Sequence, residues 1–220
     1  MRRIPERAMK GILSLLRTKP RKTQPASPHH TDSMLFASAF AHQGVDDEML
    51  VPWEARAVEV GAQRLSAHRG GKLLRHLWAK DKYMAQLDKG ALARVERFFE
   101  FATIAAHRDV IRQDEYGNFL VVVLTGTMAI DRIQPWGKQR RLAEAQPGDM
   151  LGEMSLLDSG SRFSACATLT PCEVAVLSAE GMDEMMNEEP QLAASLVTLL
   201  ARKLSLRLRA VSANLSDNQE

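Results

Sequence analysis

The stretch that decides the fold is Pro147-Gly-Asp-Met-Leu-Gly-Glu-Met-Ser-Leu-Leu-Asp-Ser-Gly-Ser-Arg-Phe-Ser-Ala165. Its middle, Gly152 to Leu157, predicts one short helical turn, and Gly152 lets the backbone approach a ligand closely. The first amides of such a turn have no partner within the helix and can point at an anion. Arg162 follows nine residues after Glu153, and a guanidinium facing those amides would cradle one phosphate. Glu153 would repel a phosphate, so we expect it to accept hydrogen bonds from a sugar hydroxyl of the same ligand.

Short strands separated by turns surround this stretch. The run Phe119-Leu-Val-Val-Val-Leu124 reads as a buried strand, and further strands are predicted at 110–111, 127–133, 140–144, 162–169 and 173–177. Strands of this length with a turn every 8–12 residues or so indicate an antiparallel sandwich or barrel rather than a parallel sheet with crossover helices. The sequence therefore predicts an α+β fold: an antiparallel β-roll or jelly-roll barrel flanked by helices.

A long helix is predicted after the strands. A short helix at 180–187 is followed by Pro190, which opens a helix over about 191–213 that contains no Gly or Pro. Its apolar side chains occupy two adjacent faces: Leu196, Leu200, Leu204, Leu208, Val211 and Leu215 on one, and Leu192, Leu199 and Leu206 on the other. Such a helix needs two apolar partners, so we expect it to pack on its own barrel and to form a homodimer through residues 191–213.

The N-terminal half divides into a tail and a helical extension. Residues 1–33 hold eight Lys and Arg against Glu6 and Asp32, a net of +6, while the rest holds 21 basic and 25 acidic residues, a net of −4. Prolines and polar residues make 1–45 a disordered basic tail and linker. Residues 46–86 form a helical N-terminal extension in which Gly70-Gly71 is expected to end the first helix. Residues 87–220 form the domain with the long helix.

The segment around Gly152-Glu-Met-Ser-Leu-Leu157 and Arg162 resembles the phosphate-binding cassette of the cyclic-nucleotide-binding domain. This family is known from bacterial catabolite activator proteins, protein-kinase regulatory subunits and gated channels. The resemblance runs from about Leu87 to Leu208 and includes turns at Gly117 and Gly126 and the Pro147-Gly-Asp149 motif. We expect no C-terminal helix-turn-helix, which is the DNA-binding module of many relatives.

The resemblance implies the roles of individual residues. Glu153 would bind the ribose 2′-hydroxyl and Arg162 the cyclic phosphate, and the amides of Gly152, Glu153 and Ser164 would complete the phosphate cage. Met154, Ser155 and Phe163 belong to the same cassette. Phe163 stands where the family usually has a small residue, and if it leans into the pocket it would crowd cAMP. The polar residues Thr198, Arg202 and Ser205 of the long helix are candidates for contact with the base.

These observations predict a cytoplasmic cyclic-nucleotide receptor, with cAMP as its ligand, that signals through movement of its C-terminal helix. The alternatives are a ligand-free dimeric scaffold in which Glu153 and Arg162 merely pair with each other, and a transcription regulator without the usual DNA-binding module. We expect no enzyme, no metal and no cofactor, because His107 is the only histidine of the barrel and no nucleophile–base pair is evident. Cys166 and Cys172 are expected to be buried hydrophobes. Specific DNA binding and a transmembrane segment are not expected.

Overall fold

The computed structural model describes residues 34–81, 84–86 and 89–217. The strands are β1 (Gln63–Arg64), β2 (Glu100–Ile104), β3 (Asp109–Ile111), β4 (Phe119–Thr125), β5 (Met128–Ile133), β6 (Gln139–Ala145), β7 (Met150–Leu151), β8 (Ala165–Thr168) and β9 (Cys172–Ser178). The helices are α2 (Leu35–His42), α3 (Trp53–Val60), α4 (Ala67–Trp78), α5 (Lys89–Val95), α6 (Glu153–Asp158), α7 (Ala179–Glu188) and α8 (Pro190–Asp217), with 3-10 turns at Asp47–Met49, Met84–Gln86 and Glu96–Phe98. The part of the predicted tail that covers residues 1–33 lies outside the described residues.

Two antiparallel sheets form a β-roll, which confirms the predicted fold class. One sheet has the order β1-β2-β9-β4-β7 and the other β3-β8-β5-β6. The unbroken apolar run of β4 follows from its position, since both of its faces are buried. Phe119, Val121 and Val123 point into the space between the sheets, whereas Leu120 and Val122 pack under the helices.

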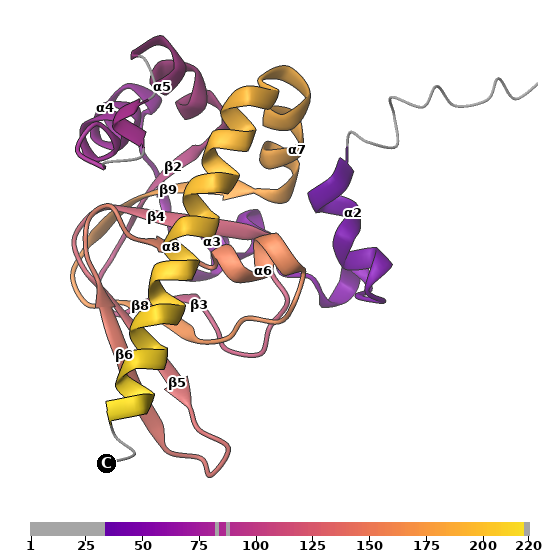
Figure 1. The fold of residues 1–220 in the computed structure, drawn as a ribbon, viewed down its shortest axis with the longest axis vertical. Helices are drawn as coiled ribbons and strands as arrows, with labels where there is room; N and C mark the ends of the chain where they lie inside the picture. The colour runs from indigo at the N-terminus through magenta and orange to yellow at the C-terminus, as the bar shows by residue number, and fades with distance from the viewer. Residues whose placement is uncertain (1–33, 82–83, 87–88, 218–220) are drawn as a thin grey trace, which may run out of the picture. The chain divides into compact units, whose positions relative to one another are not determined.

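Helices α4, α5, α7 and α8 pack against the outer face of the five-stranded sheet (Figure 1). Figure 1 shows α8 in yellow crossing the roll, with α7 beside its first turns and the β5–β6 hairpin projecting away from the roll. The first half of α8 is buried through Leu192, Leu196, Leu199 and Leu200. The predicted long helix is thus confirmed. Among the described residues, no helix is both long and apolar enough to cross a bilayer.

The prediction that Gly70-Gly71 ends a helix is wrong. Both glycines lie inside α4, where a side chain would have no room: a Cβ on Gly70 would run into the ring of Phe101, and one on Gly71 into the carboxylate of Glu96. The first helix ends earlier, at Gly61, which adopts the left-handed conformation with φ +65°. Close packing of α4 on β2 therefore explains this glycine pair.

Two further segments of the N-terminal half differ from the prediction. The extension is not wholly helical, because β1 pairs Gln63 with Thr103 and so adds a strand to the sheet. Residues 35–42, which the sequence analysis places in the tail, form α2. The carboxylate of Asp183 in α7 accepts hydrogen bonds from the amides of Phe36 and Ala37, both at 2.9 Å, and satisfies the N-terminus of α2. Tertiary contact, rather than local sequence, holds this short helix.

Candidate functional site

The cassette predicted from the sequence connects β7 to β8 through α6. Gly152 precedes α6 with φ +78°, a conformation that favours glycine. Its lack of a side chain also makes room for Arg162, because a Cβ on Gly152 would stand 2.5 Å from Nη1 of that residue. A Cβ on Gly117 would meet Nη2 at 2.7 Å. The two glycines thus form the walls around the Arg162 guanidinium.

Arg162 is buried, with 3% of its surface exposed. Its Nη1 donates to the carbonyl of Gly152 at 2.8 Å and its Nη2 to the carbonyl of Phe119 at 2.7 Å. The guanidinium also stacks on the Phe119 ring, 4.6 Å from its centroid. It forms no ion pair with any side chain in the described part of the chain. Burial, reinforced by the nearby guanidinium of Arg56, lowers the pKa of Arg162 to about 10.

Arg162 lies three residues before β8, not inside a strand that starts at 162 as predicted. Two backbone hydrogen bonds fix it there: its amide donates to Glu115 at 2.7 Å, and its carbonyl accepts from Asp114 at 2.8 Å. The turn between β3 and β4 thereby replaces strand pairing as the support for this arginine.

Glu153, the first residue of α6, is buried at 4% exposure. Its carboxylate forms an ion pair with Arg207 of α8. The scaffold alternative assumed that Glu153 pairs with Arg162. In this structure Glu153 pairs with Arg207 instead. Arg207 also donates to the carbonyl of Met150 at 3.1 Å, and Lys203 donates to the carbonyl of Gly148 at 3.2 Å.

Sequence reasoning missed Lys203 and Arg207. Both continue the buried row of α8 that starts with Leu192, Leu196 and Leu199, at spacings of four, three, four and four residues. A basic side chain on such a row packs its aliphatic part against the domain and brings its charge to the edge of the buried surface. The change from leucine to basic residues along this row was the available signal.

The three residues proposed to contact the base are exposed in this structure. Thr198 donates its hydroxyl to the carbonyl of Ala194 at 2.7 Å, a bond within the helix itself. Arg202 and Ser205 are also on exposed positions of α8. Their assignment to base recognition stays a prediction. In this structure Arg207 contacts Glu153 of the cassette, and Lys203 contacts Gly148 just before it.

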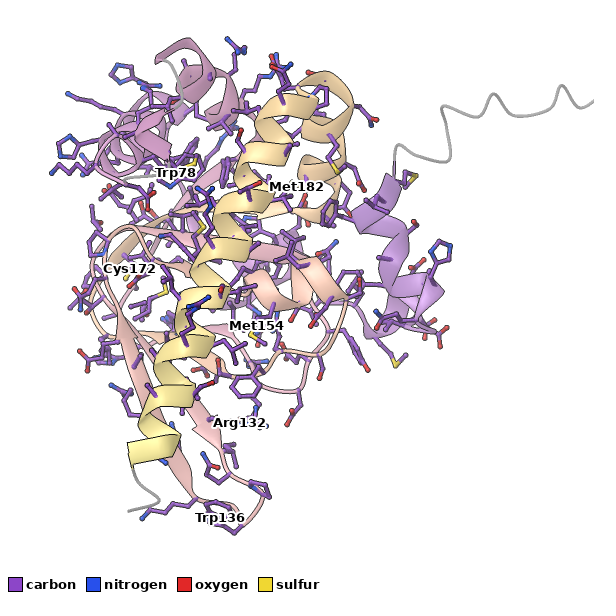
Figure 2. The ribbon with its side chains drawn as sticks, in the orientation of Figure 1. Trp78, Arg132, Trp136, Met154, Cys172 and Met182 are labelled. Carbon is purple, nitrogen blue, oxygen red and sulfur yellow. The ribbon has the colours of Figure 1, made fainter. Side chains whose placement is uncertain are left out.

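The remaining cassette residues differ in burial. Ser155 is buried and Met154 is partly exposed, and Ser164 is half-buried next to Cys166. Phe163 is 50% exposed, and the guanidinium of Arg132 in β5 stacks on its ring at 3.9 Å. Arg132 lies on the same hairpin as Trp136, which Figure 2 labels at the tip. The ring thus lies in a surface stack with Arg132.

Two observations bear on other chemistries. Cys166 and Cys172 are buried free thiols, and burial raises the pKa of Cys166 to about 12. The described residues contain no group of three or more His, Cys, Asp or Glu side chains that could hold a metal ion.

Comparisons with known proteins agree with this geometry. The family profile described as "Cyclic nucleotide-binding domain" matches residues 102–189. The chain is 27% identical over 131 residues to the CRP-like cAMP-activated global transcriptional regulator of Mycobacterium tuberculosis, covering 60% of this chain and 57% of that protein. It is 31% identical over 107 residues to the cyclic AMP receptor protein of Thermus thermophilus, covering 49% of this chain and 50% of that protein. The chain thus spans about half the length of these two relatives.

A solved structure supports the fold independently. The crystal structure of a cyclic nucleotide-binding domain from Methylobacillus flagellatus superimposes with a TM-score of 0.63 at 20% identity, covering 68% of this chain and 84% of that one. The two-sheet roll, the Gly152–Arg162 cassette and the matched profile converge on one assignment. Residues 102–189 thus match the cyclic nucleotide-binding domain family, and the fold of the described residues agrees with that match.

Proposed function

We propose that this domain is a cytoplasmic receptor for a cyclic nucleotide, with cAMP as the first ligand to test. The observation that carries the proposal is the buried guanidinium of Arg162, which has hydrogen bonds only to carbonyls and no carboxylate partner in the described chain. Charges inside proteins are normally paired, because an unpaired buried charge is costly. A site that keeps a cation in this state is suited to an anionic ligand.

The charges around Arg162 suit a singly charged anion. A cyclic phosphate carries one negative charge, which matches one guanidinium. The carboxylate of Glu153 lies on the same cassette and would accept a hydrogen bond from the ribose 2′-hydroxyl. The backbone amides at Gly152, Glu153 and Ser164 would bind the phosphate oxygens, and Ser155, Met154 and Phe163 would line the same site. These roles follow from the family resemblance applied to the positions of this chain.

Isothermal titration of the full chain with cAMP, cGMP and cyclic dinucleotides tests the proposal. We expect saturable binding of one of them. Arg162→Ala should abolish it, at a cost of about 2–4 kcal/mol, because the charge-assisted contacts to the phosphate are lost. Arg97→Ala is the matched control, since Arg97 forms an exposed ion pair with Glu188 on the helical side. Absence of heat with every nucleotide would reject the receptor function.

The signal would travel through α8. Arg207 and Lys203 attach this helix to the cassette, so a ligand that enters beside Glu153 changes the contacts of α8 directly. Movement of a helix on ligand binding presents a new surface to a partner. The mechanism contains no chemical step.

The exposed end of α8 supports a homodimer through residues 191–213. Leu206, Leu208 and Val211 are between 51% and 68% exposed, whereas the leucines of the first half are buried. Leu208 and Val211 are three residues apart, so they lie on the same face of the helix and suit a coiled-coil contact with a second copy. Sedimentation should show a dimer that Leu208→Glu dissociates. A dimer that binds no nucleotide would favour the scaffold alternative over the receptor.

A transcription regulator remains the second candidate, because the two curated relatives above are named as a transcriptional regulator and a cyclic AMP receptor. The basic segment 1–33 is the part of this chain with a suitable charge. Binding through such a segment would be salt-sensitive and independent of sequence. Gel shifts at low and moderate salt, with and without cAMP, distinguish this candidate from a receptor that acts on a protein.

A further inference from the structure

The segment that enters α3 is attached to the turn between β3 and β4. The amide of Val51 donates to the carbonyl of Tyr116 at 2.9 Å, and Leu50 pairs with Tyr116 as an isolated parallel bridge. Arg56 of α3 forms an ion pair with Glu115 of the same turn. Three residues of the N-terminal extension thus hold one short turn of the roll.

The same turn holds Arg162 from the other side. The carbonyl of Glu115 accepts the amide of Arg162 at 2.7 Å, and the amide of Asp114 donates to the carbonyl of Arg162 at 2.8 Å. Asp114 has φ +66°, a conformation that a non-glycine residue keeps only where its surroundings fix it. The backbone position of Arg162 therefore depends on where this turn lies.

The side chain of Arg162 has a second support from α3. Its guanidinium stacks on Phe119, and the carbonyl of Phe119 accepts its Nη2. Trp53 of α3 packs edge-on against the same ring, with the two ring centroids 5.6 Å apart and the planes at 63°. Trp53 is itself buried inside the roll. The ring of Phe119 thus contacts both an aromatic side chain of α3 and the guanidinium.

Only 1% of the surface of Arg56 is exposed, which is unusual because arginine side chains on helices normally reach solvent. It contacts Glu59 at 2.6 Å as well as Glu115, and its Nε has no hydrogen-bond partner among the described residues. An incompletely satisfied buried charge contributes little net stability. Its geometry does, however, fix the distance between α3 and the turn, which favours a role in positioning.

We propose that Trp53 and Arg56 are positioning residues for Arg162, although both lie outside residues 102–189, which match the family profile. Nucleotide affinity would then depend on the N-terminal extension, and any event that shifts α3 would change the affinity of the site. This inference rests on the proposed receptor function for its effect on affinity. Its structural part, the control of the β3–β4 turn by α3, can be tested without a ligand.

The test uses the full-length chain with Arg56→Met, which keeps the length and apolar part of the side chain and removes its charge. Amide hydrogen exchange of the ligand-free protein should become faster at Arg162 and Asp114, whose amides bond across the turn. Exchange at Val174 to Val176 in β9 should stay unchanged and reports the stability of the whole roll. Affinity for cAMP, or for the nucleotide found by titration, should fall about tenfold, within the range expected for indirect coupling.

Two further variants make the test specific. Arg56→Lys keeps a charge beside Glu115 and should restore most of the affinity. Arg75→Met removes an ion pair to Glu96 elsewhere in the extension, far in sequence from the turn, and should change neither the local exchange nor the affinity. If Arg56→Met loses protection throughout the chain, Trp53→Phe takes its place, because it thins the contact with Phe119 without altering charge; it should weaken binding about threefold.

The outcomes separate this inference from the function on which it rests. Faster exchange confined to the turn together with weaker binding supports the positioning role. Unchanged exchange at Arg162 and Asp114, or faster exchange with affinity within twofold of the parent chain, overturns it. If the parent chain binds no nucleotide, the receptor function fails, and the exchange result alone decides whether α3 holds the turn.

Discussion

Arg207 and Glu153 form an ion pair that joins α8 to the first residue of α6. The carboxylate is almost completely buried, whereas 45% of the Arg207 side chain is exposed. The basic partner therefore reaches in from the edge of the domain to the carboxylate that we propose reads the ribose. A ligand hydroxyl group and Arg207 would both bind the carboxylate oxygens of Glu153. The ion pair therefore connects ligand binding to the position of α8.

Arg207→Met should raise nucleotide affinity about three- to tenfold. Without Arg207, no ion pair to Glu153 has to break before the ribose hydroxyl binds this carboxylate, so a larger fraction of the molecules can bind the ligand. Titration calorimetry measures the affinity, and hydrogen exchange at the last turns of α8 should become faster in the same variant. Arg209→Met, an exposed position on the same helix, is the control. Weaker binding in Arg207→Met would instead make Arg207 part of the bound site.

Nucleotide affinity should depend on pH through Arg162. Its pKa in the ligand-free folded chain is lowered to about 10, below its ordinary value, by burial. The folded chain releases this proton at lower pH than the unfolded chain, so the cost of burying the charge is fully present below pH 10 and disappears as pH rises above it. An anion binds the charged form. Affinity should therefore stay constant between pH 7 and 9 and fall up to about tenfold per pH unit above 10.

This pH profile is measured by titration at several pH values, with circular dichroism to verify that the chain stays folded. A decrease in affinity centred near neutral pH would mean that another group, and not Arg162, controls binding.

The two glycines inside α4 should respond differently to alanine. Gly70→Ala places a Cβ against the buried ring of Phe101, and such overpacking should cost about 1–3 kcal/mol of unfolding free energy. Gly71→Ala meets the carboxylate of Glu96, the far end of a flexible side chain, and alanine favours a helix over glycine by about 0.5–1 kcal/mol. Its stability should change by less than about 1 kcal/mol. Urea unfolding of both variants measures the difference, and equal costs would contradict the close packing of Gly70 on β2.

The two cysteines should be inert in the folded chain. Both are buried, and desolvation raises the pKa of each thiol, that of Cys166 to about 12. Since the thiolate is the reactive form, iodoacetamide at pH 8 should leave the native protein unmodified and label both residues in urea. Rapid labelling without denaturant would show that β8 or β9 opens readily.

The strands of the roll could be predicted because each one is short, apolar on its buried positions and bounded by turn residues. The run Phe119–Leu124 and the short helix after Gly152 appear where local sequence places them, and β5 and β6 match the strands predicted at 127–133 and 140–144. The strands β1 and β7 were missed, since two residues carry no periodic pattern and are strands only through their partners. β2 was not among the predicted strands either, and its pairing with β1 and β9 makes it a strand.

The candidate site shows the same division. Gly152, Glu153 and Arg162 could be predicted as a cassette because this segment resembles that of a known family. The partners of these residues could not, because the contacts of Arg162 with Phe119 and of Glu153 with Arg207 join positions separated by 43 and 54 residues. No local pattern encodes such pairs.

By itself, the sequence determined the β-roll, the long terminal helix and the glycine–carboxylate–arginine cassette, because alternation, turn residues and motif spacing act over a few residues. Only the tertiary structure decided that α3 supports Arg162, that α2 docks on Asp183 and that α8 brings a basic side chain to Glu153. These contacts depend on which surfaces pack together when the chain folds. That packing is determined by the burial of whole helices and strands and not by any short segment.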